Sequence, residues 1–270
     1  MYSGISGMKN FQTKLDVIGN NIANVNTAGF KKGRITFQDM LSQTSQGASG
    51  PVGNAVNSRG GINPKQVGTG SKIGSIDTIH TQGFMQTTNE TKDLMIQGDG
   101  MFVVQNGNEK LLTRSGNFTL DKNGDLVTAD GYKVLDTTGA KINIPNGAKS
   151  LSIQKDGTVS YITEAADGTS TAVSSQKVGL FIVTNPGGLE KIGGNLYRTS
   201  PNSGGAIGAT LAEPGKGGAG DIISGVLEMS NVDLSEEFTE MITAQRGFQA
   251  NTRIITTSDE VLQELVNLKR

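Results

Sequence analysis

The feature that most constrains this chain is a seven-residue repeat of apolar side chains at each end of the sequence. Near the N-terminus, one row of the repeat holds Met1, Met8, Leu15 and Ile22, and a second row holds Phe11, Ile18 and Val25. Near the C-terminus, the two rows hold Leu234, Met241, Phe248, Ile255 and Leu262, and Ala244 and Leu265. This spacing places the apolar side chains along one stripe of an α-helix, as in the seam of a coiled coil. The sequence therefore predicts a helix over residues 1–28 and a second helix over residues 234–270.

Both predicted helices have signals at their ends. Gly29 follows the first repeat, and glycine commonly terminates a helix. Asp233, followed three residues later by Glu236, is a variant of the capping box that begins a helix. Neither helix can bury its own apolar stripe, so we expect the two helices to pack on each other and then on neighbouring molecules.

The outer face of the N-terminal helix carries few charges. Between residues 1 and 28, the charged side chains are Lys9, Lys14 and Asp16. A helix surrounded by water usually has a charged outer face, so this polar and nearly uncharged face favours contacts with other protein on several sides. An ordinary amphipathic helix with an asparagine-rich surface is the alternative interpretation.

The middle of the chain predicts β-structure. Short apolar runs alternate with Asn-Gly or Asp-Gly pairs that begin at Asn106, Asn123, Asp130, Asn146, Asp156 and Asp167. Such pairs favour type I′ hairpin turns, because both central residues of that turn need a positive φ. We therefore predict an antiparallel β-domain over 76–233, and we assign the Ser- and Gly-rich range 29–75 as an extended connector. The predicted fold class is α+β: terminal helices (1–28 and 234–270) paired as a coiled-coil-like domain, with the mainly antiparallel β-domain inserted between them.

Composition excludes several classes of protein. The chain has 24 basic and 25 acidic side chains, so it lacks the basic excess with which proteins bind nucleic acid. It has no cysteine, which excludes disulfide frameworks and thiolate metal sites. No apolar run approaches the roughly 20 residues that span a bilayer. The N-terminal segment also lacks the apolar core of a signal peptide, so we expect export, if it occurs, by another route.

The sequence offers little that could carry catalysis. The single histidine, His80, has no second histidine or cysteine with which to form a zinc site. The segment Asp121–Asp125 begins like a calcium loop, but Leu126 and Tyr132 stand where such a loop needs Gly and Glu. Gly98-Asp99-Gly100 lacks the third glycine of a dinucleotide-binding loop. We therefore predict that the chain is not an enzyme and has no cofactor, no metal site and no small-molecule substrate.

Two terminal motifs resemble those of flagellar rod and hook proteins. The first is LDVIGNNIANVNTAGFKK, which starts at Leu15 and has as its core Asn20, Asn21, Ile22, Ala23, Asn24, Asn26, Thr27, Gly29, Phe30 and Lys31. The second is marked by Ser230, Asn231, Val232, Gln245, Arg246, Phe248 and Asn251. The central segments LMIQGDGMFVV and LLTRSGNFTLDKNGDLVTADGYKVL are similar to the β-domain of the same family. The resemblance therefore covers almost the whole chain.

The resemblance implies a structural function. It implies export through the flagellar type III apparatus without a cleaved signal peptide, and terminal segments that become ordered on polymerisation. It also implies a helical homopolymer whose inner layer is built from the terminal helices. The apolar rows of the two repeats are accordingly the predicted polymerisation interface. The implied partners, besides other copies of the chain, are flagellar rod, hook-cap and hook–filament junction proteins.

Within this family, the sequence favours the hook, the extracellular flexible joint that transmits motor torque to the filament. Gly29-Phe30-Lys31, with Leu15 to Gly19 upstream, looks hook-like, and the modest length resembles the short hook proteins of Gram-positive bacteria. The distal rod protein, which forms the straight drive shaft, is the alternative. A secreted binding module with a coiled stalk is a more remote one, and it predicts a discrete oligomer instead of a tube.

Overall fold

A computed structural model of the chain describes residues 2–51, 60–145, 148, 150–164, 170–208 and 210–268. The chain divides into two compact units that interleave in sequence. Unit 1 comprises Met1–Ile22, Gly33–Asp77 and Asp233–Arg270, and unit 2 comprises Ala23–Lys32 and Thr78–Val232. Neither of the two helices seen in these residues is long and apolar enough to cross a membrane. The predicted turns at Asn146 and Asp167 lie outside the described residues.

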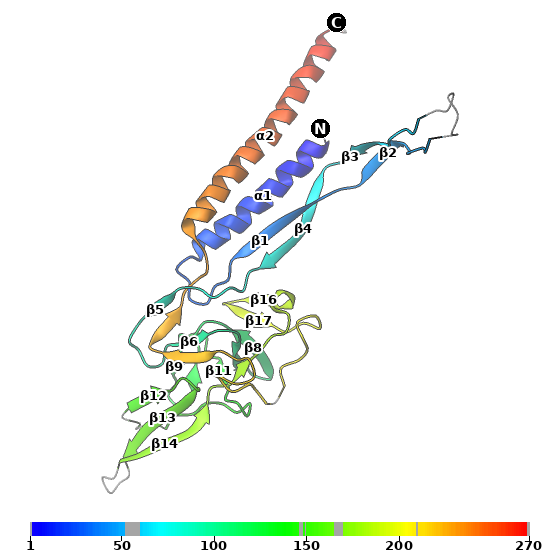
Figure 1. Cartoon of the computed structure of the whole chain (residues 1–270). Coiled ribbons are helices and arrows are strands. Elements are labelled where there is room, and N and C mark those ends of the chain that lie inside the picture. Colours follow the sequence, from blue (N-terminus) through cyan, green and yellow to red (C-terminus); the bar gives the residue numbers. More distant parts are fainter. Residues whose placement is uncertain are drawn as a thin grey trace. The chain divides into compact units, whose positions relative to one another are not determined.

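Unit 1 contains two long helices that lie side by side (Figure 1). Helix α1 spans Tyr2–Ala23 and helix α2 spans Leu234–Asn267. They run antiparallel, because Gly4 faces Ile254 near one end of the pair and Asn21 bonds to Glu237 near the other. The predicted α+β class, with terminal helices packed together and a β-domain inserted between them, is confirmed.

The first helix ends five residues earlier than predicted. After Ala23 the chain turns, and the Thr27 amide donates to the Asn24 carbonyl oxygen (3.1 Å). The Thr27 hydroxyl also bonds to the Asn24 side chain (3.1 Å). Short polar side chains that bond locally in this way compete with helical hydrogen bonds, so the helix stops before Val25 and not at Gly29.

The seam between α1 and α2 differs from the predicted apolar stripe. On α1, the buried positions are Gly4, Gly7, Asn10, Ile18 and Asn21. On α2, they are Glu237 and Ala244, and Gly247 lies against the ring of Phe11. Glycines let the two backbones approach closely, so the pair is joined largely through small and polar residues. Of the predicted apolar rows, Met8 and Phe11 contact α2 and Ile18 is buried, whereas Leu234, Leu262 and Leu265 stay exposed.

Two β-hairpin segments complete unit 1. Strand β1 (Gly33–Asp39) pairs with β4 (Ser71–Thr78), and β2 (Ser42–Gln46) pairs with β3 (Lys65–Gly68). They occupy much of the range 29–75, which the sequence predicted as a connector, and they pair into two-stranded ribbons there. On the α1 side, the rings of Phe11 and Phe37 lie 6.1 Å apart and the Asn10 amide donates to Ser71 Oγ (2.8 Å). Strands β2 and β3 escaped prediction because they are exposed throughout and contain one large apolar side chain, Val67.

Unit 2 is built from short strands and one 3₁₀ turn. Its strands are β5 Met85–Thr87, β6 Leu94–Gln97, β7 Met101–Asn106, β8 Glu109–Thr113, β9 Thr119–Leu120, β10 Leu126–Val127, β11 Lys133–Val134, β12 Ser150–Ile153, β13 Thr158–Glu164, β14 Ser170–Lys177, β15 Leu180–Phe181, β16 Glu190–Gly193, β17 Leu196–Arg198, β18 Asp221–Ser224 and β19 Val226–Glu228. The 3₁₀ turn η1 spans Pro186–Gly188. Every strand pair in this unit whose register is defined is antiparallel.

The main sheet has the strand order β16-β17-β8-β7-β11-β10-β9, with β15 also paired to β7. A second sheet has the order β12-β13-β14, and β18-β6 and β19-β5 each form a separate two-stranded sheet. Both faces of the central strand β7 are buried: Phe102 and Val104 enter one apolar cluster, and Met101 and Val103 enter another. The central sheet is therefore the rigid framework on which the polar residues described below are held.

The turn chemistry was predicted only in part. None of Asn106, Asn123, Asp130 and Asp156 has a positive φ, so the predicted type I′ turns are wrong at these positions. At three of these pairs, the glycine is the last residue of a four-residue turn. In such a turn the glycine amide donates to the carbonyl oxygen of the first residue, as Gly124 does to Asp121. There only the glycine is left-handed, with φ +79° at Gly124. Two consecutive positive-φ residues, as a type I′ turn requires, occur instead between β16 and β17 at Gly194 (φ +59°) and Asn195 (φ +58°).

Candidate functional site

The predicted polymerisation residues differ widely in their exposure in the structure. Met1 lies outside the described residues. Ile18 is buried against its neighbours, and Val25 lies in the turn after α1. Of the others, these are half-buried: Met8, Phe11, Leu15, Ile22, Met241, Phe248 and Ile255. The exposed ones are Leu234, Leu262 and Leu265.

The last turns of α2 form an apolar surface without helical cover. Gly4 of α1 lies beside Ile254, so the residues after Ile254 extend past the start of α1 (Figure 1). In this part, Leu262 is 50% exposed, Leu265 58% and Val266 66%. Exposed apolar rows are the kind of surface that proteins commonly use for interactions.

Several motif residues hold the helices and the chain between them. In unit 1, the Asn21 side chain accepts from the Gly33 amide (2.9 Å) and donates to the Gly33 carbonyl oxygen (2.9 Å). Its amide also donates to Glu237 Oε2 (3.1 Å), so one side chain joins α1, β1 and α2. On α2, Asn251 packs against Gly7 and donates to the Gly247 carbonyl oxygen (3.1 Å). These residues position the helices within the unit.

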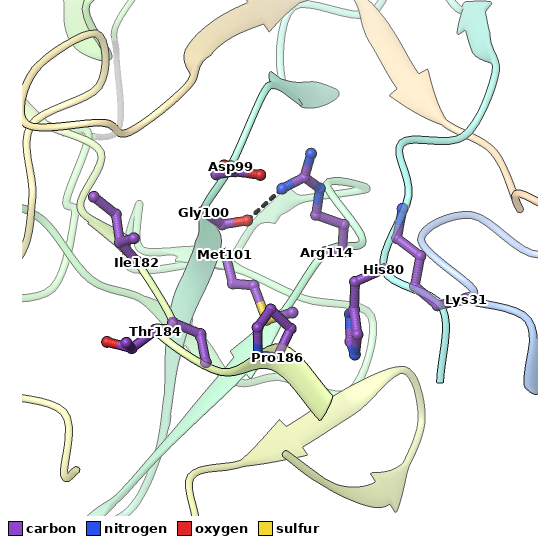
Figure 2. A pocket seen from close by; sticks show the side chains of 10 residues that line it. Lys31, His80, Asp99, Gly100, Met101, Arg114, Ile182, Thr184 and Pro186 are labelled. Carbon is purple, nitrogen blue, oxygen red and sulfur yellow. Dashed lines mark hydrogen bonds between the residues drawn. The ribbon is translucent and has the colours of Figure 1, made fainter. Parts of the chain in front are cut away.

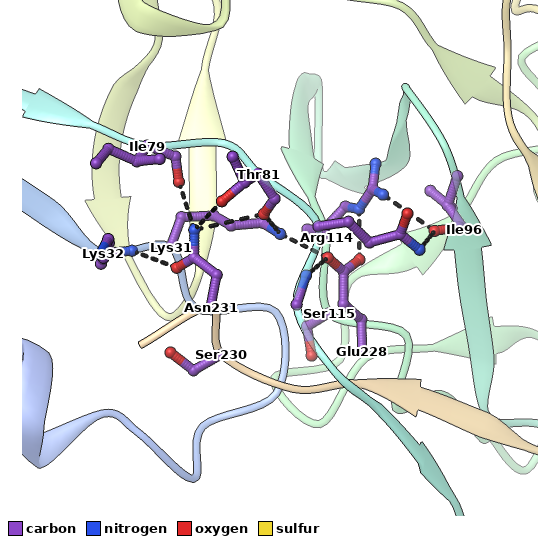
Figure 3. A network of polar contacts seen from close by, with 12 residues as sticks. Lys31, Lys32, Ile79, Thr81, Ile96, Arg114, Ser115, Glu228, Ser230 and Asn231 are labelled. Carbon is purple, nitrogen blue, oxygen red and sulfur yellow. Dashed lines mark hydrogen bonds and ion pairs between the residues drawn. The ribbon is translucent and has the colours of Figure 1, made fainter. Parts of the chain in front are cut away.

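A second asparagine has the corresponding role in unit 2 (Figure 3). Asn231 Oδ1 accepts from the Lys32 amide (2.8 Å), and its Nδ2 donates to the Ile79 carbonyl oxygen (2.9 Å) and to Thr81 Oγ1 (2.9 Å). The side chain therefore ties together three segments that are far apart in sequence. The neighbouring Ser230 is buried, and its Oγ accepts from the Val232 amide (3.3 Å).

The centre of the unit 2 network is a buried carboxylate, Glu228, held by two cations (Figure 3). Lys31 Nζ lies 2.5 Å from Glu228 Oε1, and Arg114 Nε lies 2.6 Å from Glu228 Oε2. The side chains of Glu228 and Lys31 are 0% and 2% exposed. Burial alone would raise the pKa of Glu228, but the two cations more than offset it, so its pKa lies below the ordinary value. Burial lowers the pKa of Lys31, and Glu228 opposes this effect.

Gly29 and Phe30 are positioned by the same unit. Gly29 has φ +72°, and its amide donates to the Glu228 carbonyl oxygen (2.8 Å). The Lys191 ammonium lies 5.1 Å from the centre of the Phe30 ring and donates to the Lys31 carbonyl oxygen (3.1 Å). Contacts within unit 2 thus hold Gly29, Phe30 and Lys31 in place.

The other motif residues are distributed over the two ends. Gln245 and Arg246 are exposed on α2, and Asn20 and Ala23 are exposed on α1. The turn that follows α1 contains Asn24, Asn26, Thr27 and Gly29. The motif as a whole is therefore divided between residues that fix the fold and residues that stay at the surface.

Sequence reasoning missed Arg114, Glu228, Asn195 and Lys191. Arg114 donates to Glu228 and also to the carbonyl oxygens of Ile96 (3.0 Å) and Gly98 (2.6 Å). Asn195 donates to the Ala28 carbonyl oxygen (3.0 Å). The one available signal was Glu228, an acidic residue inside the apolar strand segment 226–229, where a charge needs a partner.

The calcium-loop likeness at residues 121–125 has a structural explanation. Asp125 is buried, and its Oδ2 lies 2.9 Å from both Lys133 Nζ and Lys141 Nζ. Burial acts to raise the pKa of Asp125, but hydrogen bonds from Asn143 and the two lysines lower it to about 2. The Asp125 carboxylate is thus already paired with two lysine ammonium groups. The described residues contain no group of three or more acidic or histidine side chains that could hold a metal.

Two long terminal helices, with exposed apolar residues on the last turns of α2, and an inserted antiparallel β-unit are the features that relate this chain to known proteins. Sequence models of three families match the chain. Residues 1–31 match "Flagella basal body rod protein", residues 95–161 match "Flagellar hook protein FlgE/F/G D1 domain", and residues 223–268 match "Flagellar basal body rod FlgEFG protein C-terminal".

Curated relatives match over the full length. The chain is 58% identical to "Flagellar basal-body rod protein FlgG" of Bacillus subtilis over 270 residues, which cover 100% of this chain and 98% of the relative. It is 41% identical to the protein of the same name from Caulobacter vibrioides, over 98% of this chain and 97% of the relative. It is 33% identical to "Flagellar hook protein FlgE" of Borreliella burgdorferi, over 100% and 99%. This chain belongs to the flagellar rod and hook axial protein family and has a structural role in the flagellar axis.

Proposed function

We propose that this chain is a subunit of the flagellar basal-body rod, the straight shaft of the flagellar axis. The observation that carries the proposal is the length of the matches. The rod relative of Bacillus subtilis aligns over 270 residues, the length of this chain. The hook relatives of Borreliella burgdorferi and Treponema pallidum align over 444 and 467 positions, so they contain long stretches that this chain lacks.

The sequence-based preference for the hook is therefore replaced by its alternative. That preference depended on Gly29-Phe30-Lys31 and on the short length of the chain. The three residues have contacts inside unit 2 that any member with this β-unit could use, so they do not favour the hook. The short length is shared by the rod relatives. The hook-cap and hook–filament junction partners belonged to the hook interpretation and are not part of this proposal.

In the proposed rod, the terminal ranges 1–28 and 234–270 act as the polymerisation domain. The supporting observation is that the residues buried between the two helices differ from the apolar residues that keep exposed area. The seam within one molecule uses Gly7, Asn21 and Ala244, whereas Leu15, Phe248 and Leu262 keep exposed area. Burying apolar area contributes about 25 cal/mol per Å², so these rows favour contact with neighbouring copies. Export through the flagellar type III apparatus remains part of the proposal.

Electron microscopy of isolated hook–basal bodies, labelled with an antibody to this chain, tests the position in the axis. We expect label along the straight segment that crosses the cell envelope. Label along the curved segment outside the cell would restore the hook interpretation.

Substitutions on the last turns of α2 test the polymerisation surface. We expect the double variant Leu262→Ser, Leu265→Ser to remain monomeric under conditions in which the unaltered chain forms tubes. Glu264→Gln, on the same turn, is the matched control and should still polymerise. If the double variant forms normal tubes, the apolar row is not the interface.

A further inference from the structure

A cavity of about 220 Å³ lies within unit 2, beside the buried carboxylate network (Figure 2). Its walls include Lys31, His80, Asp99, Arg114, Thr184 and Pro186. A water molecule occupies about 30 Å³ in the liquid, so the cavity has room for a small polyatomic ion together with water. The rod proposal assigns no task to this cavity.

Cationic groups dominate the surroundings of His80. Burial is the largest cause that lowers the pKa of His80, and together with the charges of Lys31, Lys191 and Arg114 it brings the pKa to about 4. Of the acidic groups nearby, Glu228 is already held by Lys31 and Arg114, and Asp99 is exposed at the cavity wall.

The other groups that face His80 are neutral. From β17, the Tyr197 ring lies 5.6 Å from the His80 ring, and the uncharged Pro186 lies with His80 at the cavity wall. Among the groups that shift the titration of His80, each charged one is a cation, and none of them supplies a negative charge. The cavity wall therefore lies in a positive potential.

Three residues of this wall carry hydrogen-bond donors. The Lys31 ammonium has three N–H groups, of which two donate to Thr81 and Glu228. The Arg114 guanidinium has five, of which four donate to Glu228, Gly100, Ile96 and Gly98. Thr184 adds a hydroxyl group. These are the groups that recognise the oxygens of an anion.

His80 adds a group that can gain a proton. Its Nδ1 is buried, and none of the described residues lies within hydrogen-bonding distance of it. When the ring is neutral, this nitrogen is an acceptor, and protonation turns it into a further donor. Protonation is costly in a positive potential, and an anion in the cavity would remove much of that cost.

We infer that this cavity binds a small oxyanion of the sulfate and phosphate class, and that binding is coupled to protonation of His80. The coupling is reciprocal: an oxyanion in the cavity stabilises the charged imidazole, and the charged imidazole strengthens binding of the oxyanion by the same factor. The effect acts through charge, so it does not require direct contact between the ion and Nδ1.

The single histidine of the chain makes the test direct. The full-length chain, labelled with ¹⁵N and ¹³C at histidine, is titrated with sodium sulfate while NMR follows the His80 ring. Sulfate is the probe because its charge stays constant between pH 4 and 8. Sodium chloride at equal ionic strength is the salt control. We expect a saturable response to sulfate and an upward move of the His80 titration midpoint by about one pH unit, which corresponds to about tenfold tighter sulfate binding below that midpoint.

Matched variants separate the cavity from general charge effects. Lys191→Gln removes one of the cations near His80, and we expect it to weaken sulfate binding about fivefold. Lys155→Gln removes the same charge from an exposed turn between β12 and β13, and we expect no change. Thr184→Val should weaken binding through the lost hydroxyl, and Asp99→Asn should strengthen it. Circular dichroism of each variant establishes that it is folded.

Three results would overturn the inference. Equal responses of His80 to sulfate and chloride would mean that salt only screens the cations. A response that does not saturate would mean that the cavity holds water and no bound ion. Equal effects of Lys191→Gln and Lys155→Gln would place any binding elsewhere on the surface.

Discussion

The Lys31 ammonium lies 2.5 Å from the Glu228 carboxylate, although 197 positions separate the two residues in the chain. The pair joins the end of the N-terminal motif to the strand that precedes α2. Arg114 completes it on the other carboxylate oxygen, and all three side chains are buried. Because buried charges need partners, the two cations and the carboxylate are expected to depend strongly on one another.

Removing the central carboxylate should therefore be severe. We expect Glu228→Gln to lower the free energy of unfolding by about 3–5 kcal/mol, because Lys31 and Arg114 would be left buried with uncompensated charge. The matched control is Glu109→Gln, which breaks the 2.6 Å pair with Arg198 at the exposed surface. That change should cost less than about 1 kcal/mol. Urea unfolding of both variants gives the comparison, and equal costs would contradict the assigned role of burial.

Gly29 should tolerate no side chain. It has φ +72°, and a Cβ atom there would lie 2.5 Å from the Ser115 amide nitrogen. We expect Gly29→Ala to cost more than about 2 kcal/mol, because backbone strain and a clash with backbone add together. Gly131 has φ +83° with open space around it, so Gly131→Ala isolates the strain and should cost about 1 kcal/mol. Thermal unfolding measures both, and a Gly29→Ala variant as stable as Gly131→Ala would exclude the clash.

The start of α2 depends on Asp233. Its carboxylate accepts from the Ser235 amide (2.8 Å) and the Glu236 amide (3.5 Å), as the sequence predicted for a capping residue. We expect Asp233→Ala to cost about 1 kcal/mol, and Asp233→Asn to lose much less, because asparagine also caps helices. Helix content by circular dichroism during thermal unfolding checks this order. Equal losses in the two variants would mean that the negative charge, and not the hydrogen bonds, stabilises the helix.

The stability of unit 2 should decrease as the pH falls from 7 to 5. The pKa of His80 is about 4 in the folded chain and about 6.5 when unfolded. Between these values, the unfolded chain binds a proton that the folded chain does not, so acid favours unfolding. Allowing for the partial exposure of His80, we expect a loss of about 1–2 kcal/mol, which His80→Gln should abolish. Unfolding in low-salt buffer without oxyanions measures it, and a variant with the same pH slope would rule out His80 as the cause.

Local patterns predicted the helices and the β-character of the middle. The heptad rows, the Asp233 cap and the apolar strand runs depend on neighbours within a few residues, so they could be identified along the chain. The first helix was predicted to end at residue 28 but ends at Ala23, because local hydrogen bonds of Asn24 and Thr27 compete with helical hydrogen bonds. The ribbon strands β2 and β3 were missed, because they are exposed on both faces and carry no alternation of apolar and polar residues.

The sequence by itself determined the class of fold, the two helices and the membership suggested by the terminal motifs. Only the tertiary structure decided which helix residues are covered within one molecule: Gly7 and Ala244 are buried, whereas Leu15 is half-buried and Leu262 is exposed. It also decided the partners of Glu228 and Asn231. Those contacts join segments that lie far apart in the chain, and a hydrogen bond or ion pair between distant residues leaves no periodic trace in the sequence around either of them.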